Sequence, residues 1–331
     1  MTANTVTGSR TGERSGAQAL TLLASPFNHL LLRALAEGPK QQAELQRETG
    51  SPAQTTLRAH LKRLAGLEVI DKHRRNRFPG VLEYELTPAG RNLLPVVDSL
   101  ETWLGSAPEG PLPLGSGPAK AAIKALAEGW SAKMIRALAP GSLSLTELNG
   151  VIGSLSYPSL ERRLTAMRLA GLIAPQATDG HGKPYAVTEW LRLGVAPLAS
   201  AARWERHHHP RTTAPVGRLD IEAAFLLVMP LLRPPAYLSG ACRMAAEIAN
   251  GEDRRLAGVT VTVDEGTIAS CTTQLATSAS AWAHGSTHAW LDAMIERDYA
   301  QLELGGDCRL AESLLDGLHQ TLLGNRGLLR P

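Results

Sequence analysis

Cysteines and long apolar runs are scarce in this sequence of 331 residues. Its three cysteines, at 242, 271 and 308, are an odd number without the close spacing of a zinc site, so we expect reduced thiols. No run of about 18 uncharged apolar residues is present, and the polar residues 1–18 lack the apolar segment of a signal peptide. We therefore expect a cytoplasmic protein without a membrane span.

The excess of positive over negative charge is also small, because the net charge of the whole chain is only +3. Its distribution is uneven, because residues 1–218 contain 26 Lys and Arg against 17 Asp and Glu, whereas residues 219–331 contain 8 against 14. A basic part joined to an acidic part is expected when one module meets a polyanion and the other does not. The length also exceeds what one core usually serves, which predicts two or three domains.

An internal repeat relates two parts of the basic region. At an offset of 103 residues, Arg33–Ala36 falls on Arg136–Ala139, and the register then holds without gaps for about 40 positions. Near its end, residues 63–67 match residues 168–172 at an offset of 105, so two registers stay open there. A register of this length indicates two copies of one domain, over residues 24–104 and 127–206.

Each copy is predicted to contain three helices, a two-stranded hairpin and a further helix. In the first copy, residues 51–52 offer an N-cap and a first-turn proline to the third helix. That helix turns Leu57, Leu61 and Leu64 toward the core at helical spacing. Residues 81–86 alternate between apolar and acidic side chains, which is typical of a half-buried strand.

This plan is that of a winged helix-turn-helix domain. The sequence resembles the HxlR and MarR groups of bacterial winged-helix regulators through Leu57-x3-Leu61-x2-Leu64 with Val69-Ile70, and through Tyr84-x-Leu86-Thr87-Pro88-Ala89-Gly90 after the wing. The resemblance covers both copies, about 160 residues, and implies two tandem DNA-binding domains. The second copy departs from the motif, because residues 188–191 lack the Pro-x-Gly. Its assignment to the family therefore rests on the repeat as well as on its own motif.

The candidate DNA contacts lie on the third helix and the wing of each copy. Polar side chains opposite the leucines suit base edges in the major groove, and wing cations suit phosphates or the minor groove. The alternative interpretation is that a charged hairpin tip is simply solvated. Residues 51–80, however, carry seven Lys and Arg against two acids, which favours contact with DNA. The first copy offers Gln54, Thr55, Arg58, Lys62, Arg74, Arg75 and Arg77, and the less basic second copy offers Ser156, Tyr157, Ser159, Arg162, Arg163 and Lys183.

The segments around the two copies are predicted to be irregular. Residues 1–23 are expected to be a disordered tail, residues 105–126 a Pro/Gly linker and residues 207–218 a second linker. Three adjacent histidines, 207–209, cannot readily all face one ion, so no metal site and no other cofactor is expected.

Two copies in one chain resemble a covalently joined dimer. Regulators of this type usually bind pseudo-palindromes as two-fold pairs, so one chain could span two unequal half-sites as an internal pseudo-dimer. A homodimer of chains through the long helices at residues 93–103 or 191–204 is equally compatible with the sequence.

Residues 219–331 are predicted to form an α+β domain of a different kind. The expected elements are an apolar helix over 220–232, a hairpin over 259–273, a helix over 286–297, a strand over 302–304 and a helix over 309–323. Their order, with Gly285-Ser286-x3-Trp290-Leu291 opening a helix and Gly305-Gly306-Asp307 before the last one, resembles the sterol carrier protein fold over about 110 residues.

The resemblance to sterol carrier proteins implies a pocket for a hydrophobic small molecule. The alternative interpretation is that its large apolar side chains only fill a core. The candidates for its lining are Phe225, Met229, Trp282, Trp290, Met294 and Leu318.

The sequence thus predicts an α+β protein with two tandem winged helix-turn-helix domains followed by a sterol-carrier-like ligand-binding domain. The leading hypothesis is a transcriptional repressor whose operator affinity changes when a hydrophobic effector binds. One alternative is a ligand-sequestering or carrier protein whose winged helices serve as a protein-interaction scaffold. An acyl-transfer or hydrolytic enzyme is a further alternative, but no nucleophile elbow, phosphate loop or metal motif is present, so we expect no enzyme.

Overall fold

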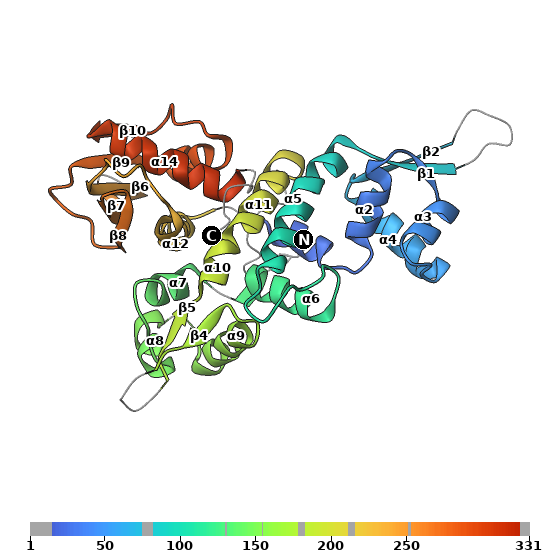
Figure 1. Cartoon of the computed structure of the whole chain (residues 1–331), viewed down its shortest axis with the longest axis horizontal. Helices are drawn as coiled ribbons and strands as arrows, with labels where there is room; N and C mark the ends of the chain where they lie inside the picture. Colours follow the sequence, from blue (N-terminus) through green and yellow to red (C-terminus); the bar gives the residue numbers. More distant parts are fainter. Residues whose placement is uncertain are drawn as a thin grey trace, which may run out of the picture.

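The computed structural model describes residues 15–74, 82–129, 131–153, 155–177, 183–210, 216–250 and 253–324. Helices and strands are both present, as the α+β prediction requires. Figure 1 shows three groups of elements arranged around helices α5 (Pro88–Gly105) and α11 (Val195–His208). We refer to residues 28–105 as the first unit, 132–208 as the second unit and 218–323 as the C-terminal unit.

The first unit combines four helices with a small sheet. Its helices are α2 (Asn28–Ala36), α3 (Gln42–Glu48), α4 (Gln54–Gly66) and α5, and its strands are β1 (Lys40–Gln41), β2 (Ile70–Arg74) and β3 (Leu82–Leu86). The antiparallel sheet has the order β1-β3-β2. Leu57, Leu61 and Leu64 are buried as predicted. The predicted N-cap is wrong, because Ser51 has a left-handed φ of 54° and α4 begins after Ala53.

The Thr-Pro-x-Gly motif starts α5 and fastens it to the hairpin. The Thr87 hydroxyl accepts a hydrogen bond from the Gly90 amide at 3.0 Å and donates to the Val69 carbonyl, also at 3.0 Å. A Cβ at Gly90 would lie 2.1 Å from that carbonyl oxygen, so only glycine allows this approach. The motif is therefore a packing requirement of the junction between hairpin and helix.

The same order of elements recurs in the second unit. It contains α7 (Ala132–Leu138), α8 (Leu145–Ile152), α9 (Tyr157–Leu169), β4 (Ile173–Pro175), β5 (Tyr185–Val187), α10 (Glu189–Leu193) and α11. The pairing of Lys40 with Tyr84 in the first unit has its counterpart in a bridge between Leu143 and Tyr185. Thr188 donates to the Leu172 carbonyl at 2.9 Å, as Thr87 does to that of Val69.

Part of the predicted tail is a buried helix, so the prediction of disorder over residues 1–23 is wrong for its last third. Helix α1 (Ala17–Leu23) packs on α11, and Leu20 and Leu23 have no exposed surface. The Glu205 carboxylate on α11 accepts hydrogen bonds from the backbone amides of Gly16 at 2.7 Å and Ala19 at 2.9 Å. A carboxylate at a helix N-terminus satisfies amides that have no partner within the helix.

The predicted linker over residues 105–126 is also partly helical. Residues Gly117–Lys124 form α6, and Ala125–Gly129 continue as the π-helix η1. At the offset of the internal repeat, Ala122-Ile123 and Leu126 of this segment match Ala19-Leu20 and Leu23 of α1. The matched residues are buried in both helices, so each copy begins with one more helix than the sequence analysis predicted.

The C-terminal unit contains a five-stranded sheet with helices packed on it. Its elements are α12 (Arg218–Val228), the 3-10 turn η2 (Met229–Leu231), β6 (Gly240–Asn250), β7 (Asp253–Asp264), β8 (Thr267–Thr272), β9 (Ala281–Gly285), α13 (Thr287–Leu291), the π-helix η3 (Asp292–Glu296), β10 (Glu303–Gly306) and α14 (Cys308–Leu323). The strand order is β10-β9-β6-β7-β8, with only β6 and β9 parallel. The predicted hairpin and helices are present, whereas β6 and β9 were not predicted.

Large apolar side chains fill the space between this sheet and its helices. Phe225 and Trp290 meet edge to face with ring centroids 4.8 Å apart, and both are fully buried. The indole of Trp290 donates to the Ala245 carbonyl on β6 at 2.9 Å.

Among the described residues no single helix is long and apolar enough to cross a membrane. Helices α1 and α2 have the length and composition for a span only as a pair, and this pair is bent by 85°.

Candidate nucleic-acid interface and cavity

Helix α4 presents a polar face without ionic partners. Burial of its three leucines leaves Gln54, Thr55, Arg58 and Lys62 exposed on the other side. Neither Arg58 nor Lys62 pairs with a carboxylate in the described part of the chain. Uncompensated cations on an exposed helix leave side chains available for an anionic partner.

The wing next to α4 carries mixed charge where it is described. Arg74, at the end of β2, is exposed, while Arg75 and Arg77 lie outside the described residues. His73 on β2 lies 3.9 Å from the Glu83 carboxylate and 3.7 Å from that of Glu85, both on β3. Glu83 and Glu85 thus lie along β3, and Arg74 is the cation nearest to the point where the described part of the hairpin ends.

The corresponding surface of the second unit also carries three of the predicted cations among the residues that the structure describes. Ser156, Tyr157, Arg162 and Lys183 are exposed, and Ser159 and Arg163 are half-buried. Two apolar side chains are also exposed at this end of the unit, Val151 on α8 by 66% and Tyr157 on α9 by 45%. All six predicted residues therefore reach the surface at least in part, but on a more apolar background than in the first unit.

The two units are joined by reciprocal contacts between α5 and α10–α11. Trp103 and Trp190 are stacked with ring centroids 4.6 Å apart and planes at 14°, and each indole donates to the other residue's carbonyl at 2.9 Å. Trp204 near the end of α11 donates to the Ala89 carbonyl at the start of α5, at 2.8 Å.

Two of these hydrogen bonds are related by an approximate two-fold symmetry within one chain. At an offset of 101 residues, which also relates Thr87 to Thr188, Trp103 corresponds to Trp204 and Ala89 to Trp190. The bond from Trp103 to the Trp190 carbonyl is thus the counterpart of the bond from Trp204 to the Ala89 carbonyl. An isologous interface between two identical subunits has this form.

The C-terminal unit is docked on the second unit through α12 and α7. Arg136 on α7 lies 2.7 Å from the carboxylate of the buried Glu222 on α12. Arg192 on α10 reaches across the same contact, donating to the carbonyls of Leu226 at 2.6 Å and Ala139 at 3.3 Å. Burial lowers the pKa of the Arg192 guanidinium.

Ionic contacts fasten the same unit to the end of α11. Glu296 on η3 accepts from Arg203 at 2.9 Å and lies 3.1 Å from the His207 ring. Arg206 donates to Asp292 at 2.6 Å. His207 of the histidine run thus forms part of the contact between α11 and the C-terminal unit.

Glu222 is expected to weaken this docking at neutral pH. Burial raises the pKa of its carboxyl, against the opposing attraction of Arg136 and Arg218. A carboxyl group whose pKa is raised by folding contributes stability at pH values below its unfolded-state pKa, which is about 4.3 for Glu. That stability is lost as the pH rises through the folded-state pKa. Replacing Glu222 by Gln should therefore raise the urea midpoint at pH 7, and the gain should shrink as the pH falls toward 4.

The exposed Glu161 on α9 provides the matched control for that measurement. Its replacement by Gln should leave the urea midpoint unchanged at both pH values. A Glu222→Gln variant that is less stable than the natural chain at pH 7 would show instead that the ion pair with Arg136 dominates.

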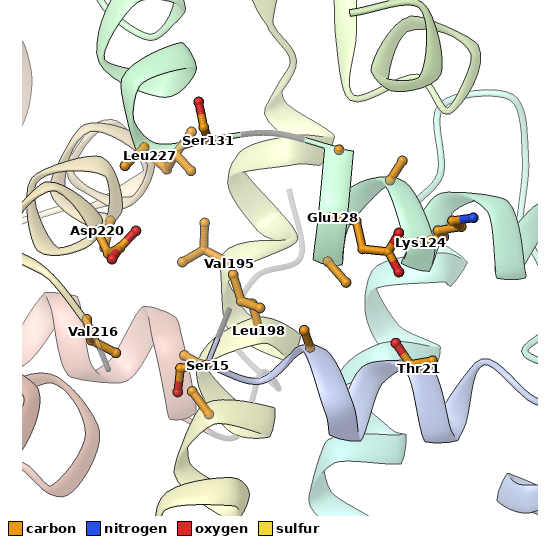
Figure 2. A pocket seen from close by; sticks show the side chains of 18 of the residues that line it. Ser15, Thr21, Lys124, Glu128, Ser131, Val195, Leu198, Val216, Asp220 and Leu227 are labelled. Atoms are coloured by element: carbon orange, nitrogen blue, oxygen red, sulfur yellow. The ribbon is translucent and has the colours of Figure 1, made fainter. Parts of the chain in front are cut away.

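A cavity of about 1690 Å³ lies where the three units meet. It is lined by parts of α1, α6, η1, α9, α11, α12, α13 and η3, together with Arg63 of α4 and Leu322 of α14. Figure 2 shows Val195 and Leu198 of α11 in its middle, with Lys124 and Glu128 on one side and Asp220 and Leu227 of α12 on the other.

Of the six predicted ligand-lining residues, the structure places only Met294 at this cavity. Phe225, Met229, Trp290 and Leu318 have no exposed surface and fill the core of the C-terminal unit. Trp282 is half-buried, lies 4.7 Å from the His284 ring and covers Gly305. This cavity was not predicted from the sequence, because its walls come from elements far apart in the chain.

Comparison with known proteins separates the first unit from the rest. Residues 22–109 match the HxlR-like helix-turn-helix family. This HxlR-like domain has the element order and buried leucines described above, and the match supports a DNA-binding transcriptional regulator. Helix-turn-helix regulators of this kind bind double-stranded DNA, often as dimers, and are generally not enzymes.

Solved structures of regulators are similar to part of the chain. The reduced form of the transcriptional regulator YodB from B. subtilis is 27% identical over 28% of this chain and 90% of its own, with a TM-score of 0.27. A protein described as a transcriptional regulator of the MarR family from Enterococcus faecalis V583 is 27% identical over 30% of this chain and 90% of its own, with a TM-score of 0.26. None of the curated proteins compared matches the chain.

Proposed function

We propose that this protein is a transcriptional repressor that binds DNA through two winged helix-turn-helix domains held as an internal pseudo-dimer. The observation that carries the proposal is the exposed polar face of helix α4 in the HxlR-like domain. The cations on this face pair with no carboxylate in the part of the chain that the structure describes. Such a helix suits the major groove, where Arg binds guanine and Gln binds adenine.

The second unit supports the pseudo-dimer. It repeats the element order of the HxlR-like domain, and the paired Trp contacts relate the two units as an isologous interface relates two subunits. The apolar sides of α5 and α11 are already occupied by each other, which favours pairing within one chain over a homodimer through these helices. One chain would then bind two unequal half-sites, with α9 as the weaker reader.

The C-terminal unit would supply the response to a hydrophobic effector. The sequence of this unit resembles sterol carrier proteins, and the unit has a five-stranded sheet with helices packed on it, although its strands β6 and β9 were not predicted. An effector changes operator affinity only through different affinities for the DNA-competent and incompetent states, and a contact between the units is needed to link them. The docking of α12 on α7 and the ionic contacts of α11 supply that link.

The proposal is tested by selecting DNA sequences from a random duplex pool with the purified full-length chain. We expect enrichment of a site with two unequal halves, and an affinity that falls steeply with salt. A chain that serves as a carrier with a protein-interaction scaffold would enrich no sequence at any ionic strength, and this result would overturn the proposal.

The wing contact gives a quantitative prediction. Replacing Arg74 by Ala should lower the slope of log affinity against log salt by about 0.9, because one phosphate contact is lost. Fluorescence anisotropy with the selected duplex measures that slope over a salt range of roughly 50–200 mM. Arg309→Ala, which removes an exposed arginine from the C-terminal unit, should leave the slope unchanged; equal effects of the two substitutions would argue against wing binding.

A further inference from the structure

We propose that the cavity between the three units binds an acidic amphiphile, a molecule with an elongated apolar body and one carboxylate. The anionic group would lie toward the cations of α4, α6 and α9, and the apolar body would extend between α11 and the C-terminal unit. The coupling of this site to DNA rests on the proposed function, whereas the binding of the ligand does not.

The walls of the cavity are suited to an apolar body. Val195 and Leu198 of α11 face it from one side, and Ile221 and Leu227 of α12 and Met294 of η3 line it from the C-terminal unit. The cavity, of about 1690 Å³ and partly open to solvent, is larger than the roughly 300–1000 Å³ of pockets for drug-sized ligands, which leaves room for a longer molecule.

The charged residues of the lining favour an anion. Four cations line the cavity, Arg63 of α4, Lys124 of α6, and Arg162 and Arg163 of α9, and none of them pairs with a described carboxylate. The lining acids are Glu128 and Asp220, which leaves a net charge of +2. Asp220 accepts a hydrogen bond from the Gly217 amide at 2.9 Å and so caps α12.

The cations lie apart from the apolar wall of the C-terminal unit. Lys124 is the last residue of α6, and α9 packs on η1, which follows directly. Figure 2 shows Lys124 on the side of the cavity opposite Asp220 and Leu227 of α12. Glu128 lies on the same side as Lys124, so the four cations exceed the acids there, whereas Asp220 opposite is occupied in capping α12. This excess of cations opposite the aliphatic residues of α12 complements a molecule with a charged head and an apolar tail, since charge-assisted hydrogen bonds from Arg and Lys to a carboxylate are among the stronger ones.

Helix α9 connects this cavity to the proposed DNA surface. Arg162 and Arg163 line the cavity and are also the cations of α9 that the sequence analysis assigned to DNA. A bound carboxylate and a DNA phosphate would therefore compete for the same two side chains. Occupancy of the cavity weakens DNA binding by the second unit, and by linkage DNA weakens ligand binding by the same factor.

The binding test uses 11-(dansylamino)undecanoate, a fluorescent carboxylate with an apolar chain, and the full-length protein. We expect one probe molecule per chain, displacement by palmitate, and displacement by hexadecanol that is at least tenfold weaker. Lys124→Ala should weaken the probe about tenfold or more, whereas Lys120→Ala should not, because Lys120 is exposed on the same helix but does not line the cavity.

A second variant tests the apolar part of the cavity. Ala199→Trp places an indole in the lining on α11 and should abolish probe binding while the thermal unfolding transition is retained. If hexadecanol displaces the probe as well as palmitate does, or if Lys124→Ala and Lys120→Ala behave alike, the site is not the proposed one.

The coupling is tested by titrating the probe into the complex with the selected duplex. We expect the affinity for DNA to fall at least fivefold at saturating probe, and the Ala199→Trp variant to show no fall. Probe binding with the predicted variant pattern but without any selected DNA would overturn the proposed function and retain the site. Sequence-specific DNA binding without probe binding would overturn the site and retain the proposed function.

Discussion

Replacing Trp103 by Ala is expected to lower the free energy of unfolding by about 3–5 kcal/mol. The side chain is fully buried, stacks on Trp190 and donates to the Trp190 carbonyl at 2.9 Å. Truncation would leave a cavity between α5 and α10 and remove the hydrogen-bond donor of a buried carbonyl. Urea denaturation followed by circular dichroism measures the loss, together with any change in the slope of the transition.

A conservative variant separates packing from hydrogen bonding. Trp103→Phe keeps an aromatic ring against Trp190 but removes the indole donor, so it should lose less than Trp103→Ala and at least about 1 kcal/mol. Tyr237→Ala is the control, because that side chain is 80% exposed, and its stability should change by no more than about 0.5 kcal/mol. A loss below about 1 kcal/mol for Trp103→Ala would mean that the reciprocal tryptophan contact does not hold the units together.

The repeat in the sequence relates helix positions that the structure buries in both units. Leu57, Leu61 and Leu64 and their counterparts on α9 are buried on one helix face, as helical periodicity requires. The orientation of α5 against α11 could not be predicted in this way. It depends on indole hydrogen bonds to backbone carbonyls, which leave no periodic signal in the sequence.

Helix α1 shows why a terminal segment was assigned to disorder. Its N-terminus has no side-chain cap of its own. The carboxylate that accepts hydrogen bonds from the amides of Gly16 and Ala19 belongs to Glu205, which in the sequence lies near the end of the second unit. Its apolar residues form a short run that is stable only when packed on α11, since isolated helices of this length are marginal. Tertiary contacts therefore determine this helix.

The cavity was missed for a related reason. The large side chains of the C-terminal unit attract a ligand hypothesis, but Phe225 and Trp290 are the residues best suited to fill the space between sheet and helices. Much of the observed lining consists of small or aliphatic residues on elements far apart in the sequence, such as Ala125 of η1, Ala199 of α11 and Ala224 of α12. Each of these residues is ordinary within its own helix, and only the arrangement of the units brings them together.

The base contacts of α4 give the prediction with the largest effect on DNA binding. Replacing Arg58 by Ala should weaken binding to the selected duplex by about 1–3 kcal/mol and relax the preference for one base pair. The arginine is exposed and has no described ionic partner, so its removal costs the fold little. Competition binding against duplexes that differ at single positions measures both the affinity and the preference.

Arg63 on the same helix is the matched control. It is exposed like Arg58, but it lines the cavity and does not belong to the residues predicted to contact bases. Arg63→Ala should keep the base preference and lose only the smaller, sequence-independent share of affinity that any cation near DNA supplies. If Arg58→Ala weakens all duplexes equally, α4 contacts phosphates rather than bases, and the half-site would then have to be read by the wing.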